Sequence, residues 1–78
     1  MKNGNGNGNG ARHYGVVREY NNVRGVGYIE LDDGGEHAFV RYSWIGGAGV
    51  RSLTAGQRVS FELDRDGQSL NALRVLEA

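Results

Sequence analysis

Arg24-Gly25-Val26-Gly27-Tyr28-Ile29 is the stretch that decides the fold, and Phe39-Val40-Arg41-Tyr42 follows it after nine intervening residues. Both segments interleave aromatic residues with arginines and aliphatic residues, a composition typical of strands. Two such strands side by side form a flat, cationic surface on which planar rings can stack. The paired glycines indicate close backbone approach or strand bending.

The flanking chain predicts further short strands, because its apolar residues follow no sustained helical period and turn residues interrupt it. We expect strands at residues 14–21, 25–31, 37–42, 57–64 and 70–76, turns at 32–35 and 66–67, and a flexible crossover beginning at 46–49. Five short antiparallel strands around one core close most economically into an all-β barrel, since closure removes exposed edges.

Alternation within the last two strands predicts which side chains face the core. In the fourth strand Val59, Phe61 and Leu63 fall on one face, and the opposite face carries Arg58, Ser60, Glu62 and Asp64. In the last strand we expect Leu73 and Val75 to point inward.

The 78-residue length allows one domain, whose folded form buries only about 60% of the surface that the unfolded chain exposes. The sequence lacks cysteine, which excludes disulfides, thiolate metal sites and a thiol nucleophile. There is no signal-peptide core and no apolar run near the roughly 20 residues of a membrane span, so we expect a cytoplasmic protein without membrane contact. Asn-Gly repeats at residues 3–10 predict a disordered tail over 1–12, with the barrel at 13–78.

The charge balance argues against a strong overall attraction to nucleic acid, because nine basic residues match nine acidic ones. The distribution is uneven, however. Arginines such as Arg12 and Arg18 come early, whereas Glu62, Asp64 and Asp66 gather late. A neutral chain of this kind can still carry a basic face.

Several spaced motifs resemble the cold-shock domain family. Residues 15–21, 24–29 and 39–43 are similar to the family's G-x-V-K-W-F-N, K-G-F-G-F-I and F-V-H-F-S segments, and residues 52–61 to its S-L-x-x-G-Q-x-V-x-F segment. The match runs in register from residue 15 to about 76. The resemblance implies a five-stranded Greek-key barrel of the oligonucleotide-binding (OB) fold.

Three positions depart from that pattern. Glu19 stands where the family has a stacking Trp, Val26 where it has a Phe, and Val50 where a loop Phe is usual. Arg41 replaces a base-contacting His and Tyr42 replaces a Phe. Arginine stacks through its guanidinium plane and pairs with phosphate, so the Arg41 change is compatible with binding.

The resemblance implies stacking roles for Tyr28 and Phe39, which we favour over ordinary cross-strand packing because Ile29 and Leu31 already supply the inward face. Tyr42 faces either the core, as strict alternation requires, or the ligand. Trp44 either caps the barrel end, which is the interpretation we favour, or supplies a relocated stacking surface. The predicted nucleic-acid-binding residues are Arg18, Arg24, Tyr28, Phe39, Arg41, Tyr42, Trp44 and Arg51.

Other polar residues receive simpler interpretations. Arg58, Arg65 and Arg74 are interpreted as solvated charges, and Tyr20 as a core residue. Neither His13 nor His37 has catalytic or metal-ligand spacing, and no third glycine completes a dinucleotide-binding loop, so we expect no enzyme activity, metal or cofactor.

The sequence therefore predicts a cold-shock-like protein that binds single-stranded RNA or DNA with low sequence specificity and, as the resemblance implies, acts as an RNA chaperone. The alternative is a barrel with weakened or lost nucleic-acid binding that serves as a protein-interaction module. A weak homodimer stays open as well, because Trp44 and Val50 either join an apolar patch or cover the barrel end.

Overall fold

The computed structural model describes residues 12–46 and 52–78. Within them lie five strands and one short 3-10 turn: β2 (His13–Asn21), β3 (Val26–Leu31), β4 (His37–Arg41), η2 (Tyr42–Trp44), β5 (Arg58–Asp66) and β6 (Ser69–Glu77). Each predicted strand appears with its ends shifted by at most one or two residues. Residues 1–11 of the predicted tail, most of the glycine crossover, Val50 and Arg51 lie outside the described residues, whereas Arg12, the last residue of that predicted tail, is described.

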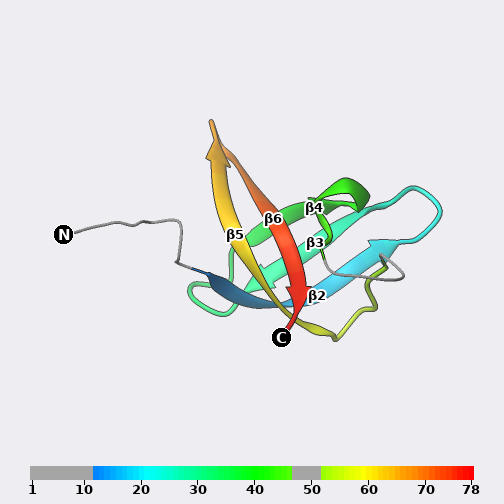
Figure 1. The fold of residues 1–78 in the computed structure, drawn as a ribbon. Helices are drawn as coiled ribbons and strands as arrows, with labels where there is room; N and C mark the ends of the chain where they lie inside the picture. Colours follow the sequence, from blue (N-terminus) through cyan, green and yellow to red (C-terminus); the bar gives the residue numbers. More distant parts are fainter. Residues whose placement is uncertain (1–11, 47–51) are drawn as a thin grey trace.

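The five strands form a closed barrel in the order β2-β3-β4-β6-β5, with β2 pairing to β5 to complete it. The long β5–β6 hairpin rises steeply across the more gently inclined β2, β3 and β4 (Figure 1). Every neighbouring pair is antiparallel except β4 and β6, which run parallel. The predicted all-β, OB-type barrel is therefore confirmed, with one parallel junction that strand patterns alone did not indicate.

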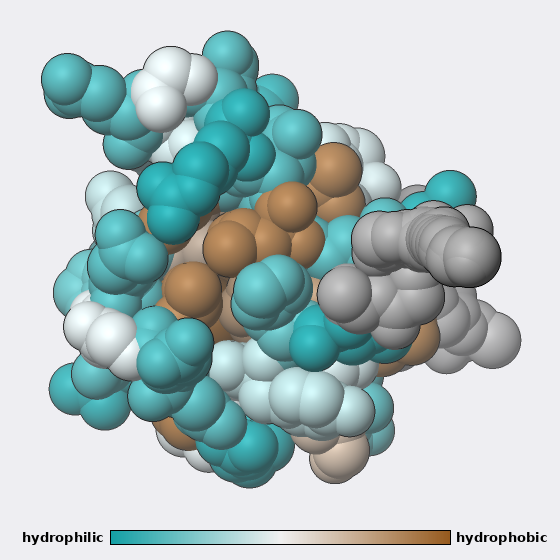
Figure 2. All heavy atoms as spheres, turned by 90° about the vertical axis from the view of Figure 1, so that its left-hand side faces the viewer, coloured by the Kyte–Doolittle hydropathy of each residue, from teal (hydrophilic) through white to brown (hydrophobic). Residues whose placement is uncertain are grey.

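The core is a single apolar cluster inside this barrel. Its six largest fully buried side chains are those of Val17, Ile29, Val40, Val59, Phe61 and Val75. Figure 2 shows the face of the molecule that lies to the left in Figure 1. Apolar residues reach the surface in the middle of this face, beside hydrophilic residues. Among the described residues, no helix is long and apolar enough to cross a membrane.

Two inward and outward assignments were wrong, both beside one irregularity of the β5–β6 ladder. Ser60 is buried rather than outward-facing, and Ala72 takes the core position expected for Leu73, which is half-buried. The register shifts between Ser60 and Glu62, and on the facing strand Arg74 has a φ of 50°. Such a bulge places an extra residue in one strand, so strict alternation fails there.

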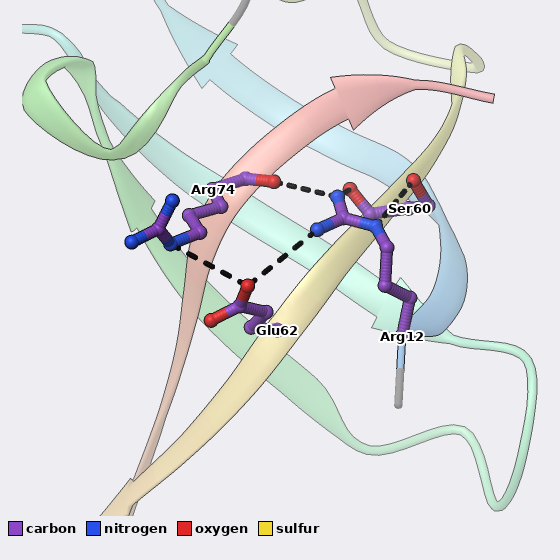
Figure 3. Close-up of polar contacts among 4 residues, drawn as sticks. All are labelled: Arg12, Ser60, Glu62 and Arg74. Atoms are coloured by element: carbon purple, nitrogen blue, oxygen red, sulfur yellow. Dashed lines mark hydrogen bonds and ion pairs between the residues drawn. The ribbon is translucent and has the colours of Figure 1, made fainter. Parts of the chain in front are cut away.

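Arg12, which directly precedes β2, covers this bulge with its side chain (Figure 3). Its guanidinium donates hydrogen bonds to the Ser60 hydroxyl at 3.1 Å, the Ser60 carbonyl at 2.8 Å and the Arg74 carbonyl at 2.6 Å. The same group lies 3.9 Å from the Glu62 carboxylate. These bonds satisfy polar groups that the irregular ladder would otherwise leave without partners.

The glycine at position 27 permits the closest approach of two strands. A Cβ built there would lie 2.1 Å from the Glu19 carbonyl oxygen and 2.8 Å from the Tyr20 Cα, both backbone atoms that cannot rotate away. Gly27 therefore serves the close backbone approach that its sequence context predicts.

We predict that Gly27→Ala lowers the free energy of unfolding by at least about 2 kcal/mol, because backbone must move to admit the methyl group. Chemical denaturation followed by circular dichroism measures the loss. The matched control is Gly67→Ala, where φ is 64° but no atom lies within 4 Å of the new Cβ, so only conformational strain of about 1 kcal/mol is added. Equal losses in the two variants would contradict the steric explanation.

We also predict that Arg12→Gln destabilises the protein by about 1–3 kcal/mol, because the part-buried hydroxyl and carbonyl oxygens of Ser60 lose this donor. Arg65→Gln serves as the control, since Arg65 is exposed and its guanidinium lies 3.7 Å from Glu36 in a surface ion pair. Such pairs contribute about 0–1 kcal/mol. Urea unfolding of both variants tests the difference, and an Arg12 effect no larger than that of Arg65 would refute it.

Candidate nucleic-acid interface

The outward face of β3 and β4 carries an aromatic pair. Tyr28 and Phe39 are direct cross-strand partners, and their ring centroids lie 6.2 Å apart at an interplanar angle of 67°. Tyr28 is 47% exposed and Phe39 is half-buried. Because the neighbouring Ile29, Ala38 and Val40 fill the core, the outward rings are left free to accept a further planar group.

The ladder of rings continues from Phe39 to η2. Trp44 meets Phe39 edge to face, with centroids 6.1 Å apart and planes at 87°. The Arg41 guanidinium carbon lies 5.5 Å from the Phe39 centroid and 4.9 Å from that of Trp44. Contacts of this length are favourable cation–π interactions, so the exposed Arg41 side chain rests on both rings.

The 3-10 turn explains how Trp44 reaches this position. After Arg41 the chain leaves the extended conformation, and the next residue to enter the core is Ile45, which is only 6% exposed. Trp44 itself is half-buried against the outer ladder. This geometry favours the relocated-surface interpretation of Trp44, because Ile45 supplies the side chain that covers the core at this turn.

Tyr42 begins the same turn and is 54% exposed, so strict alternation into the core fails at the point where β4 ends. Its backbone N–H donates to the Gly25 carbonyl at 2.7 Å, and its Cβ packs against Gly25. Beneath this contact the Tyr20 hydroxyl is buried, and within the described part of the chain it has no hydrogen-bond partner. Burial, and secondarily the nearby Tyr42, raises the pKa of Tyr20 above its ordinary value.

Arg24 stands on a rigid hairpin at the margin of the face. The Asn21 side-chain oxygen accepts the backbone N–H groups of Val23 and Arg24, each at 2.9 Å. Such side-chain to backbone bonds fix a turn. Arg24, Tyr28 and Phe39 help to line an open hollow of about 300 Å³.

The β2 margin of the face is less suited to an anion. A register shift between Val17 and Glu19 leaves Arg18 and Glu19 both exposed, with Glu19 opposite Tyr28 and also lining the hollow. Arg18 is engaged in an ion pair with Glu30, at 3.2 Å. The structure thus separates Arg18 from the ladder, while Arg51 lies outside the described residues.

One neighbour of the ladder was missed from the sequence. The His37 ring lies 6.4 Å from that of Tyr28 at an angle of 44°. The sequence placed His37 at the start of the strand expected at 37–42 and gave it no role in the site, although its pairing with Glu30 makes it a diagonal neighbour of Tyr28 on the same face. Counting register back from the Tyr28–Phe39 pair is the signal that finds it.

The assembled surface offers exposed ring faces, two exposed guanidinium groups and hydrogen-bonding side chains. This combination can stack planar groups and neutralise anionic ones. Among residues 12–46 and 52–78 there is no cluster of three side chains suited to holding a metal ion.

Comparison with known proteins agrees with this description. Residues 13–78 match the family described as the 'Cold-shock' DNA-binding domain. The chain is similar to Cold shock protein CspA of Rhizobium meliloti, with 42% identity over 70% of this chain and 80% of that protein. It is also similar to Cold shock protein CspB of Geobacillus stearothermophilus, with 40% identity over 81% of this chain and 94% of that protein.

A plant protein shows the same likeness over a smaller part of its length. Glycine-rich protein 2 of Nicotiana sylvestris is 43% identical over 74% of this chain but only 27% of its own length. With the barrel, the aromatic face and these similarities together, the chain belongs to the cold-shock domain family.

Proposed function

We propose that this protein binds single-stranded RNA or DNA with low sequence specificity, by stacking bases on Tyr28 and Phe39. The observation that carries the proposal is the exposed Tyr28 ring beside a continuous Phe39, Arg41 and Trp44 ladder. Every base has a π face, so a platform of this kind accepts all of them. Membership of a nucleic-acid-binding family supports the same conclusion.

The expected affinity is modest. A stacking platform contributes about 1–3 kcal/mol per base, and at two described positions the family's aromatic residues are replaced by Glu19 and Val26. Losing several kcal/mol moves a nanomolar interaction into the micromolar range. Weak stacking with rapid release suits an RNA chaperone that traps unpaired strands transiently.

Arginines supply the attraction to phosphate in this proposal. Arg24 and Arg41 border the aromatic face, and among the described residues no ion pair engages either side chain. Tyr42 and Arg51 are also proposed to contact the nucleic acid, as the sequence predicts. Arg18 contributes less, because its partner Glu30 already neutralises it.

A second function is favoured by one specific observation, the exposed carboxylate of Glu19 opposite Tyr28. A negative charge at the margin of a stacking face repels phosphate, and the chain has no net charge to compensate. The alternative is therefore a barrel that uses this face to bind another protein.

We predict that the double variant Tyr28→Ala, Phe39→Ala binds single-stranded oligonucleotides at least about thirtyfold more weakly, because each lost stack removes about 1 kcal/mol or more. Fluorescence anisotropy with labelled oligo-dT measures the change, and circular dichroism confirms the fold. Tyr14→Ala is the control. Tyr14 is a surface tyrosine that is 50% exposed, as Tyr28 nearly is, but it lies on β2 where that strand pairs with β5. Unchanged affinity in the folded double variant would rule out this assignment.

Salt dependence tests the phosphate contacts separately. With about three contacts the slope of log affinity against log salt is about −2, so binding to oligo-dT or oligo-U should weaken about ten- to twentyfold or more between about 50 and 200 mM. If the protein binds neither oligonucleotide at low salt but retains a protein partner after nuclease treatment, the protein-interaction function takes its place.

A further inference from the structure

Beyond the Tyr28–Phe39 face lies a second hollow, between η2 and β6. It is an open groove of about 470 Å³ lined by Ser43, Trp44, Ile45, Gly46, Leu73 and Arg74. Trp44 belongs to both places, because its ring meets Phe39 and Arg41 and the residue also lines the groove. The groove therefore continues the aromatic ladder rather than forming a separate site.

The strand order places the groove in line with the stacking face. β6 follows β4 in the barrel, with Phe39 beside Asn71 and Ile45 bridged to Val75. A path across the outer surface thus runs from Tyr28 on β3 to Phe39 on β4, then over Trp44 to β6. An extended ligand that stacks on the first two rings meets Trp44 and the groove next.

Arg74 is held at the groove by an unusual backbone conformation. Its φ of 50° lies in the left-handed region, which residues other than glycine rarely adopt. Arg12 stabilises this conformation by donating to the Arg74 carbonyl, and the Arg74 Nε lies 3.4 Å from the Glu62 carboxylate. Figure 3 shows the rest of the Arg74 guanidinium pointing away from Glu62, and its side chain is 76% exposed.

The charges around Arg74 leave it attractive to an anion. Arg12 and Arg74 share the single carboxylate of Glu62, so the three side chains together carry a net positive charge of one. Arg41, whose guanidinium carbon lies 4.9 Å from the Trp44 ring centroid, adds a second positive charge nearby. The groove therefore combines a ring, an open volume and a cation, which are the elements of a nucleotide subsite.

We infer that the groove between η2 and β6 is an additional nucleotide subsite, in which a base packs against Trp44 and its phosphate pairs with Arg74. This inference rests on the proposed single-strand binding and specifies where the strand leaves the Tyr28–Phe39 face. It replaces the interpretation of Arg74 as a solvated charge. Arg12 acts as a positioning residue, because it fixes the backbone from which Arg74 extends.

The test is anisotropy titration of labelled oligo-dT with wild type, Arg74→Gln and Arg65→Gln. One phosphate contact on a single strand contributes a slope of about −0.7, so Arg74→Gln should weaken binding about eightfold at 50 mM salt and about threefold at 200 mM. Arg65→Gln is the matched control, because Arg65 is a similarly exposed β5 arginine paired with a carboxylate. Arg74→Lys should restore the salt slope.

Trp44 gives an independent readout, because it is the only tryptophan in the chain. Stacking of a base on its ring should quench its fluorescence on oligonucleotide addition, and Arg74→Gln should reduce this quenching at equal saturation. Trp44→Ala should weaken binding about fivefold or more. The double variant Trp44→Ala, Arg74→Gln should lose less binding free energy than the sum of the two single variants, since one nucleotide contacts both side chains. If Trp44→Ala does not fold, Trp44→Phe takes its place in these titrations, because it keeps an aromatic ring at this position.

The outcomes separate this inference from the proposed function. If wild type binds and the Tyr28, Phe39 double variant does not, but Arg74→Gln matches Arg65→Gln in affinity and salt slope, the subsite is refuted while single-strand binding stands. If wild type fails to bind oligo-dT or oligo-U at low salt, both fall. An Arg74-specific loss with a shallower slope and reduced Trp44 quenching supports the subsite.

Discussion

The close approach of β2 to β3 at Gly27 is the constraint on which the rest of the structure depends. Only a residue without a Cβ lets the Glu19 carbonyl lie so near the facing strand. Because the two backbones meet there, the sheet bends enough to close over a small core. The same contact orients the neighbouring positions, so that Gly27 is buried while Tyr28 is displayed outside. A Cβ at Gly15 would likewise lie 2.4 Å from the Glu30 carbonyl oxygen, so two glycines together allow the close β2–β3 pairing beside the stacking face.

The arginines at two irregular positions differ in how far a carboxylate neutralises them. Arg18 lies at the shift in β2 and Arg74 at the shift between β5 and β6, and each pairs with a carboxylate. Glu30 has Arg18 as its partner at 3.2 Å, whereas Glu62 is divided between Arg74 and Arg12. The Arg18 charge is consequently neutralised and the Arg74 charge is not. The two sites therefore differ by one positive charge, which the additional arginine, Arg12, supplies.

The strands, the barrel and the adjacency of Tyr28 and Phe39 were predictable, because turn residues and two-residue alternation specify them within short segments. The burial of Ser60 and the exchange of Leu73 for Ala72 were not, since an extra residue in a ladder becomes visible only when both strands are aligned. The orientation of Tyr42 stayed open at the sequence level for a related reason: η2 begins at that residue and ends the alternation. The contact of Arg41 with Trp44 likewise depends on how that turn folds back.

The departures from the family pattern change the charge and the aromatic content from one margin of the face to the other. Glu19 places a negative charge at the β2 margin, where the family has a ring, whereas Trp44 adds a ring at the opposite margin, between Arg41 and Arg74. Charges act over about 10 Å at 0.1 M salt, so under the proposed function Glu19 would repel a phosphate chain from the β2 margin, and Arg41 and Arg74 would attract it toward β6. The aromatic rings extend toward β6 as well, because Trp44 lies beyond Phe39 and the Arg41 guanidinium rests on both of these rings. Under the proposed single-strand binding, stacking and electrostatics therefore favour a footprint displaced along the barrel toward Trp44, in addition to the modest affinity that the lost rings imply.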